Sequence, residues 1–149
     1  MCYKSIMEEA EKYVGEEKPK IQNPSDLAKI MRPLCNELMQ ETFFVILLNT
    51  KHNVIKIQQV TVGLLDRTQT HAREIFRDAI IANAHSVILC HNHPSGDPTP
   101  SASDLSTTRR LIEAGEIIGI KVLDHLIMGK KSTNMAIDFL SFSNENLMP

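Results

Sequence analysis

The sequence predicts an α/β domain with a mixed β-sheet flanked by helices. Short apolar segments that favour strands alternate along the chain with amphipathic segments of helical period. Two of the strand segments are separated only by "KHN", which predicts an antiparallel hairpin. A third, "SVILC", is fully apolar, which is typical of a strand covered on both faces of a sheet. A chain of 149 residues is long enough to bury a sizeable core in one such domain.

Two helices are expected in the N-terminal part of the chain. Apolar residues at helical spacing predict a helix over residues 3–14. A second helix is expected to be capped at Ser25, kinked or restarted at Pro33, and to end near Met39. We therefore expect residues 1–24 to form a helical appendage and residues 25–149 to form the main domain.

The hairpin comes next and is followed by a helix. The β-branched and aromatic segments "TFFVILLNT" and "VIKIQQVTV" supply its two strands. After Gly63 a polar connection leads to an amphipathic helix over residues 70–84, and "SVILC" then forms the central strand.

The C-terminal part should contain one more helix and two more strands. The helix runs over residues 103–114, and Gly119 ends that region. The strands are "IKVLDHLIM" and "MAIDFLSF".

Composition favours a soluble protein of the cytoplasm. The net charge of −2 argues against a dedicated nucleic-acid binder, so we expect DNA to bind weakly if at all. Three widely spaced cysteines are poor material for a disulfide framework, which indicates a reducing compartment. The longest apolar run, "FFVILL", is too short to span a bilayer, and no secretory signal opens the chain.

The stretch "LCHNHPSGDPTPSASD", residues 89–104, carries the main candidate site. Residues two apart on a strand point to the same side, so His91 and His93 should present their imidazoles together, with Cys90 on the other side. Asp104 falls in the first turn of the next helix, where its carboxylate can return over the imidazoles. Two neutral imidazoles, one carboxylate and a fourth position left for water are typical of a catalytic zinc site.

A simpler interpretation exists for part of this stretch. Ser101 and Asp104 form a Ser-x-x-Asp box that commonly caps helices, and an acidic residue is favoured in a first turn. Capping accounts for either residue alone. Capping does not account for the paired histidines at the C-terminal end of the apolar strand that precedes this box.

These residues resemble a known family. "HNHPSGDPTPSASD" fits the pattern His-x-His, seven residues, Ser, two residues, Asp, which is the signature of the JAMM (MPN+) metalloproteases. "HAREIFRDAIIANAHSVIL" and "TRRLIEAGEIIGIKVLDHLI" look like the RadC branch, and the resemblance covers residues 37–130. It implies a cytidine-deaminase-like mixed sheet with zinc held by His91, His93 and Asp104. It also implies that Ser101 helps to stabilise the tetrahedral intermediate.

The resemblance leaves two segments unmatched. The segment before it lacks the helix-hairpin-helix character usual in RadC proteins, which removes the expected anchor for DNA. The end, "GKKSTNMAIDFLSFSNENLMP", departs from the usual closing strand.

Attack of a zinc-bound water on an amide needs a carboxylate as general base. In JAMM proteases this glutamate lies upstream, just before or at the start of an apolar strand, and Glu41 fits that place. The assignment requires the start of that strand to lie beside the end of "SVILCH". Glu74 and Glu37 are the alternatives, and each of the three would otherwise be an ordinary surface charge. His125, inside an apolar strand, is expected to be a hydrogen-bonded core histidine, with a supporting role beside the metal as the alternative.

Two functions of different classes follow. The first is a zinc-dependent hydrolase that cleaves a peptide or isopeptide bond, with a peptide or protein as substrate. The alternative is a catalytically weak RadC-like module with a role in DNA repair or partner binding. A third, an HNH nuclease suggested by the letters "HNH", fails because the residues of that motif are not consecutive.

Overall fold

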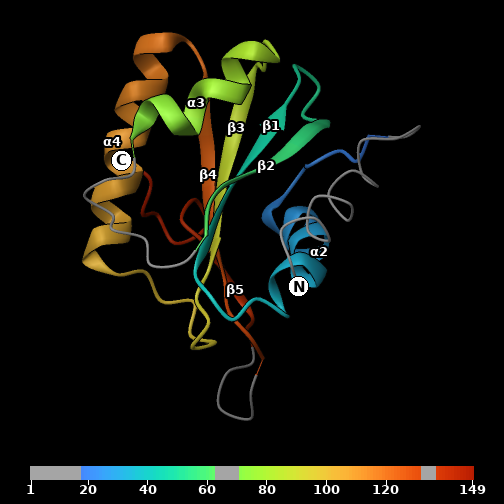
Figure 1. Ribbon diagram of the computed structural model, residues 1–149, viewed down its shortest axis with the longest axis vertical. Helices are drawn as coiled ribbons and strands as arrows, with labels where there is room; N and C mark the ends of the chain where they lie inside the picture. The colour runs from blue at the N-terminus through green and yellow to red at the C-terminus, as the bar shows by residue number, and fades with distance from the viewer. Residues whose placement is uncertain (1–17, 63–70, 132–136) are drawn as a thin grey trace.

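The computed structural model describes residues 18–62, 71–131 and 137–149, and in them the chain forms one mixed β-sheet with helices on both faces (Figure 1). The predicted α/β class is therefore confirmed. The helix predicted over residues 3–14 lies outside the described residues. The elements in chain order are α2 (Pro24–Cys35), β1 (Thr42–Leu48), β2 (Val54–Val62), α3 (Ala72–Ile81), β3 (Ser86–Asn92), α4 (Ala102–Ile118), β4 (Lys121–Met128) and β5 (Phe139–Ser141).

The five strands are arranged in the order β2-β1-β3-β4-β5. β1 pairs antiparallel with β2, which confirms the predicted hairpin, and also antiparallel with β3. β3 and β4 run parallel and are joined by α4, because parallel neighbours need a crossover connection. The register pairs Phe43 with His91, so the start of β1 lies beside the end of β3.

Each face of the sheet has its own hydrophobic core. α2 covers one face, and α3 and α4 cover the other (Figure 1). Every residue of β1 and of β3 is buried, as expected for strands covered on both faces. The core under α2 includes Leu27, Met31, Phe44, Ile46, Ile88 and Cys90, and the core under α3 and α4 includes Phe43, Val45, Ile75, Phe76, Leu89 and Leu111.

α2 begins and ends earlier than the sequence predicts. Its N-cap is Asn23 and not Ser25, because the Asn23 side chain accepts a hydrogen bond from the backbone N–H of Asp26. Pro24 is the first residue of the helix. Proline is favoured there because its fixed φ suits a helix and its missing N–H would be unpaired in any case. Pro33 lies inside the last turn without breaking the helix, which ends at Cys35 and not near Met39.

The remaining elements differ from prediction mainly at their ends. α3 is shorter than the predicted 70–84, and α4 continues one turn past the predicted 103–114. Gly119 ends α4 as expected, with a φ of 78° that favours glycine. β5 covers only part of the predicted "MAIDFLSF", and residues 132–136 lie outside the described ranges. No helix within the described ranges combines the length and apolarity needed to cross a bilayer.

Candidate metal centre

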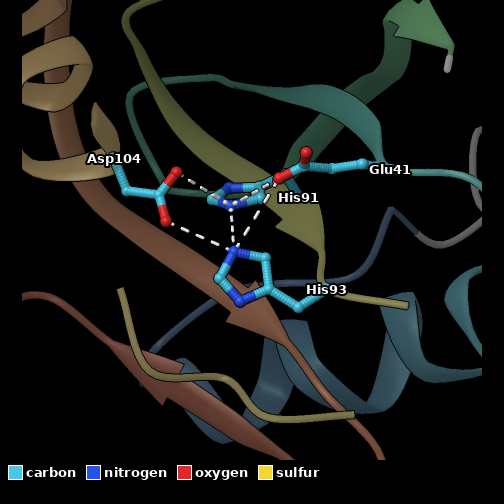
Figure 2. A group of neighbouring side chains, drawn as sticks. All are labelled: Glu41, His91, His93 and Asp104. Carbon is cyan, nitrogen blue, oxygen red and sulfur yellow. Dashed lines mark hydrogen bonds and ion pairs between the residues drawn. The ribbon is translucent and has the colours of Figure 1, made fainter. Parts of the chain in front are cut away.

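Four ionisable side chains meet where β3 ends beside the start of β1. Glu41, His91, His93 and Asp104 each offer one potential ligand atom, and these atoms all lie within 4.8 Å of one another. Figure 2 shows Asp104 and Glu41 approaching the two imidazoles from opposite sides. We call these four residues the metal-binding cluster. The structure thus brings together the three predicted metal ligands and the preferred candidate for the base.

The end of β3 positions the two histidines. His91 is the next-to-last residue of β3, and His93 follows the strand with its backbone N–H donated to the Met128 carbonyl at 2.8 Å. Their Nε2 atoms lie 3.0 Å apart, so the rings face the same space as the alternation of a strand predicts. Cys90 lies in the core on the opposite face, also as predicted.

The loop after His93 is anchored on the end of β4. Gly96 has a φ of 94°, and its carbonyl accepts the backbone N–H of Lys130 at 2.8 Å. A Cβ on Gly129 would lie 2.2 Å from the Gly96 oxygen, so the two segments can approach this closely only because residue 129 is glycine. His93 Nδ1 lies 2.9 Å from the Asp97 carbonyl, to which it can only donate. In a neutral His93 ring, this bond leaves the lone pair of Nε2 directed into the cluster.

Asp104 acts both as a helix cap and as a member of the cluster. Ser101 is the N-cap of α4: its Oγ accepts the Asp104 N–H at 3.0 Å, and Asp104 Oδ2 accepts the Ser101 N–H at 2.8 Å. The same carboxylate places Oδ1 3.4 Å from His91 Nε2 and Oδ2 3.2 Å from His93 Nε2. The capping and ligand interpretations of this residue are therefore compatible.

The spacing of these atoms fits a tetrahedral metal ion. Zinc binds imidazole nitrogen and carboxylate oxygen at about 2.0–2.2 Å, which separates neighbouring tetrahedral ligands by roughly 3.3 Å. The distances from His91 Nε2 to His93 Nε2 and to Asp104 Oδ1 are 3.0 and 3.4 Å. The donor set and its spacing show that the cluster could hold a metal ion.

Glu41 lies slightly farther from the imidazoles than Asp104 does. Its Oε1 atom is 3.6 Å from His91 Nε2 and 3.8 Å from His93 Nε2. The antiparallel pairing places the start of β1 beside the end of β3, which is the arrangement that the assignment of Glu41 as the base requires. Glu37 and Glu74 are exposed and do not belong to the cluster.

Asn92 holds the segment that carries Glu41. It is buried at the end of β3, where its Oδ1 accepts the Thr42 N–H at 2.7 Å and its Nδ2 donates to the Gln40 carbonyl at 3.1 Å. These bonds fix the backbone on both sides of Glu41. No role for Asn92 was predicted from the sequence. The available signal was a polar amide at the end of an otherwise apolar strand.

The surroundings of the cluster shift the pKa values of its members. Burial lowers the pKa of His91. Burial also opposes the ionised form of Asp104, but interactions with the imidazoles of His91 and His93 outweigh it and hold the pKa of that carboxyl far below its usual range. For His93, burial lowers the pKa, and the bonds to Asp104 and to the Asp97 carbonyl outweigh it and raise the pKa. An ionised Asp104 and a neutral His91 are the forms that metal binding requires.

His125 of β4 lies directly behind His91. Its Nε2 is 2.7 Å from His91 Nδ1, and its Nδ1 is 2.6 Å from the Thr108 hydroxyl. Burial holds the pKa of His125 well below its usual range. The prediction of a buried, hydrogen-bonded core histidine is confirmed, and the ring also contacts a member of the cluster. Thr108 was not identified from the sequence, where it is one of several polar residues in α4.

Comparison with known proteins identifies the relatives of this chain. The family model described as "RadC-like JAB domain" matches residues 21–147. A UPF0758 protein of Clostridium beijerinckii is 52% identical over 110 residues, which cover 74% of this chain and 48% of that protein. A UPF0758 protein of Desulforudis audaxviator is 44% identical over 127 residues, which cover 85% of this chain and 55% of that protein. The chain therefore spans about half the length of the curated relatives it matches.

Proposed function

The chain belongs to the RadC-like JAB domain family, and from this premise we propose that it is a zinc-dependent hydrolase that cleaves a peptide or isopeptide bond. The observation that carries the proposal is the metal-binding cluster, in which two imidazoles and one carboxylate surround a common point with a second carboxylate beside them. A zinc ion bound there would act as a Lewis acid and lower the pKa of water to about 7.

His91, His93 and Asp104 would hold the metal. The Asp104 carboxylate lies closer to the imidazoles than Glu41 does, with Oδ1 3.4 Å from His91 Nε2 and Oδ2 3.2 Å from His93 Nε2. Two imidazoles with one carboxylate form a known ligand set of catalytic zinc. Such a set occupies three of four tetrahedral positions. The fourth remains for water or substrate, as hydrolysis requires.

Glu41 would transfer the proton. A carboxylate beside the reacting water can accept its proton and return it to the leaving amine, provided that it lies within hydrogen-bond reach. Glu41 Oε1 is 3.6 Å from His91 Nε2, so it lies next to the ligands without being as close to them as Asp104 is. Asn92 holds the backbone on both sides of this residue, which restricts where its carboxylate can lie.

Ser101 would stabilise the developing negative charge. The residue stands at the N-cap of α4, beside Asp104, and its Oγ already accepts a backbone N–H. A hydroxyl donor placed at the oxygen of a tetrahedral intermediate lowers the barrier, because the charge on that oxygen is greatest in the transition state.

The test compares Glu41→Gln with the wild-type protein, both loaded with zinc, on a pool of peptides and isopeptides. Glu41→Gln should keep its fold and about one zinc per chain, while cleavage falls by roughly 10²–10⁴-fold with the lost proton transfer. Glu37→Gln is the matched control, because Glu37 is an exposed glutamate four positions earlier in the sequence and outside the cluster. Equal cleavage by Glu41→Gln would contradict its role, and a zinc-loaded wild type that cleaves nothing would favour the non-catalytic module.

A further inference from the structure

A continuous chain of buried hydrogen bonds runs from a metal ligand to the backbone of α4. His91 Nδ1 contacts His125 Nε2 at 2.7 Å, His125 Nδ1 contacts Thr108 Oγ1 at 2.6 Å, and Thr108 Oγ1 contacts the Asp104 carbonyl at 2.7 Å. All three side chains are about 1% exposed. We call His91, His125, Thr108 and the Asp104 carbonyl the hydrogen-bonded chain. It begins and ends on residues of the metal-binding cluster.

The donor and acceptor of each hydrogen bond follow from the Asp104 carbonyl at one end of the hydrogen-bonded chain. A carbonyl oxygen can only accept, so the single hydroxyl proton of Thr108 is donated to the Asp104 carbonyl. The same hydroxyl must therefore accept at its contact with His125, which places a proton on His125 Nδ1.

The same reasoning shows which ring donates in the hydrogen bond between His125 and His91. In the neutral His125 ring with Nδ1 protonated, Nε2 has only a lone pair, so it accepts from His91 Nδ1 at 2.7 Å. A neutral His91 protonated at Nδ1 has its lone pair on Nε2, the atom that faces His93 and Asp104. The opposite direction would put a proton on His91 Nε2 and prevent that atom from binding a metal ion.

Aromatic packing keeps both rings in the required orientation. Phe43 stacks on His91 with an interplanar angle of 6°, and Phe142 stacks on His125 with an angle of 24°. Turning either ring over would exchange a nitrogen for a carbon in the hydrogen-bonded chain and leave a buried partner unpaired, at a cost of about 1–3 kcal/mol.

We propose that Thr108 and His125 are positioning residues that hold His91 in the Nδ1-protonated tautomer, so that its Nε2 is ready to bind the metal. Asp104 then contributes twice, with its carboxylate in the cluster and its carbonyl as the acceptor that sets the direction of the whole chain. The inference rests on the metal-binding part of the proposed function and is independent of hydrolysis.

The direct test is the ¹⁵N spectrum of the histidine rings in metal-free protein at neutral pH, together with zinc affinity from competition with a chromophoric chelator. Wild-type protein should show His91 and His125 protonated at Nδ1 and unprotonated at Nε2. Thr108→Val has nearly the same shape and removes the hydroxyl, so it should lose this pattern and bind zinc about 10- to 100-fold more weakly. Thr108→Ser restores the hydroxyl and should restore both readouts.

A matched control separates this effect from a general loss of packing. Thr107→Val changes the neighbouring buried threonine of α4, which lies outside the hydrogen-bonded chain, and should leave the tautomers and the zinc affinity unchanged. A proton on Nε2 of His91 in the wild type, or wild-type zinc affinity in Thr108→Val, would overturn the proposal. Zinc binding with the expected tautomers but without peptide cleavage would support it while contradicting the proposed hydrolase.

Discussion

Asp104 shows how one residue can satisfy two interpretations of a sequence motif. A capping box needs an acceptor in the first turn of α4, and a metal site needs a carboxylate beside the imidazoles. The geometry allows both, because Oδ2 accepts the Ser101 N–H while the carboxylate lies 3.2–3.4 Å from the two histidines. The pattern Ser-x-x-Asp alone could not distinguish these roles. The preceding His-x-His made the prediction of a metal site specific.

Ser101→Ala should weaken both the helix and the reaction. The substitution removes the side-chain acceptor of the Asp104 N–H and should lower the free energy of unfolding by about 1 kcal/mol, as loss of an N-cap does. Turnover should also slow if the hydroxyl meets the developing oxyanion. Urea unfolding and peptide cleavage measure the two effects. Ser106→Ala, at an exposed position in α4, is the control, and an unchanged urea midpoint in Ser101→Ala would contradict the capping role.

Asn92→Ala should affect catalysis more than metal binding. The substitution leaves the Thr42 N–H and the Gln40 carbonyl without their partner, which should cost about 1–3 kcal/mol of stability and loosen the segment that carries Glu41. Cleavage should therefore fall while zinc affinity stays close to wild type. Asn36→Ala, at the exposed end of α2, is the control. A loss of zinc equal to the loss of activity would show that Asn92 does not act through Glu41.

At the scale of elements, the sequence predicted which segments are strands and helices better than where they end. The strands were recognised because β1 and β3 each contain a run of consecutive apolar residues, which follows from burial on both faces. The start of α2 was missed because Asn23, Ser25 and Asp26 are all capable caps, and only the bonds that form distinguish them. α4 continues past the predicted residue 114 as far as Gly119, whose φ of 78° ends the helix.

The pair of Arg32 and Asp138 connects α2 to the segment leading into β5. Arg32 donates to the Asp138 carboxylate through Nε and through Nη2, the latter at 3.1 Å, and these hydrogen bonds hold the pKa of Asp138 below its usual range. A carboxyl whose pKa is lowered on folding stabilises the protein above its unfolded pKa, about 3.9, and loses that contribution as pH falls through the folded value.

Asp138→Asn should therefore make the free energy of unfolding depend less on pH in the acidic range. The difference in the free energy of unfolding between wild type and variant should be full near neutral pH and should shrink below about pH 4. Urea unfolding of both proteins over a series of pH values, with chelator present throughout, measures this difference. A difference that stays constant down to about pH 2 would show that the ion pair does not contribute through the charge of Asp138.

At the scale of the whole molecule, the predicted class is confirmed and the three residues predicted as ligands lie together, because both predictions depend on local patterns. The long-range contacts around the site could not be predicted. Asn92 reaches Thr42 across fifty positions of sequence, and His91 reaches His125 across thirty-four, so both contacts depend on the register of paired strands. Glu41 could be predicted only with the help of the family resemblance. The pairing of β1 with β3 is what places it beside the histidines.

The net charge of the chain predicts the strength of its DNA binding. With a net charge of −2, this chain should bind DNA only weakly and without sequence preference, and the binding should vanish at physiological salt. Fluorescence anisotropy of a labelled duplex over a salt series measures this. Nanomolar binding that survives about 200 mM salt would contradict the prediction, because binding to phosphates alone weakens steeply with salt.

We propose that His91, His93 and Asp104 bind one catalytic zinc ion while Glu41 stays outside the ligand set. Anomalous diffraction at the zinc absorption edge, from crystals of zinc-loaded protein, tests it directly. We expect one strong peak about 2.0–2.2 Å from His91 Nε2, His93 Nε2 and an Asp104 oxygen. Glu41 should lie within about 2.6–3.2 Å of the water in the fourth position. Zinc ligated by Glu41 in place of Asp104, or no anomalous peak at the cluster, would contradict this ligand assignment.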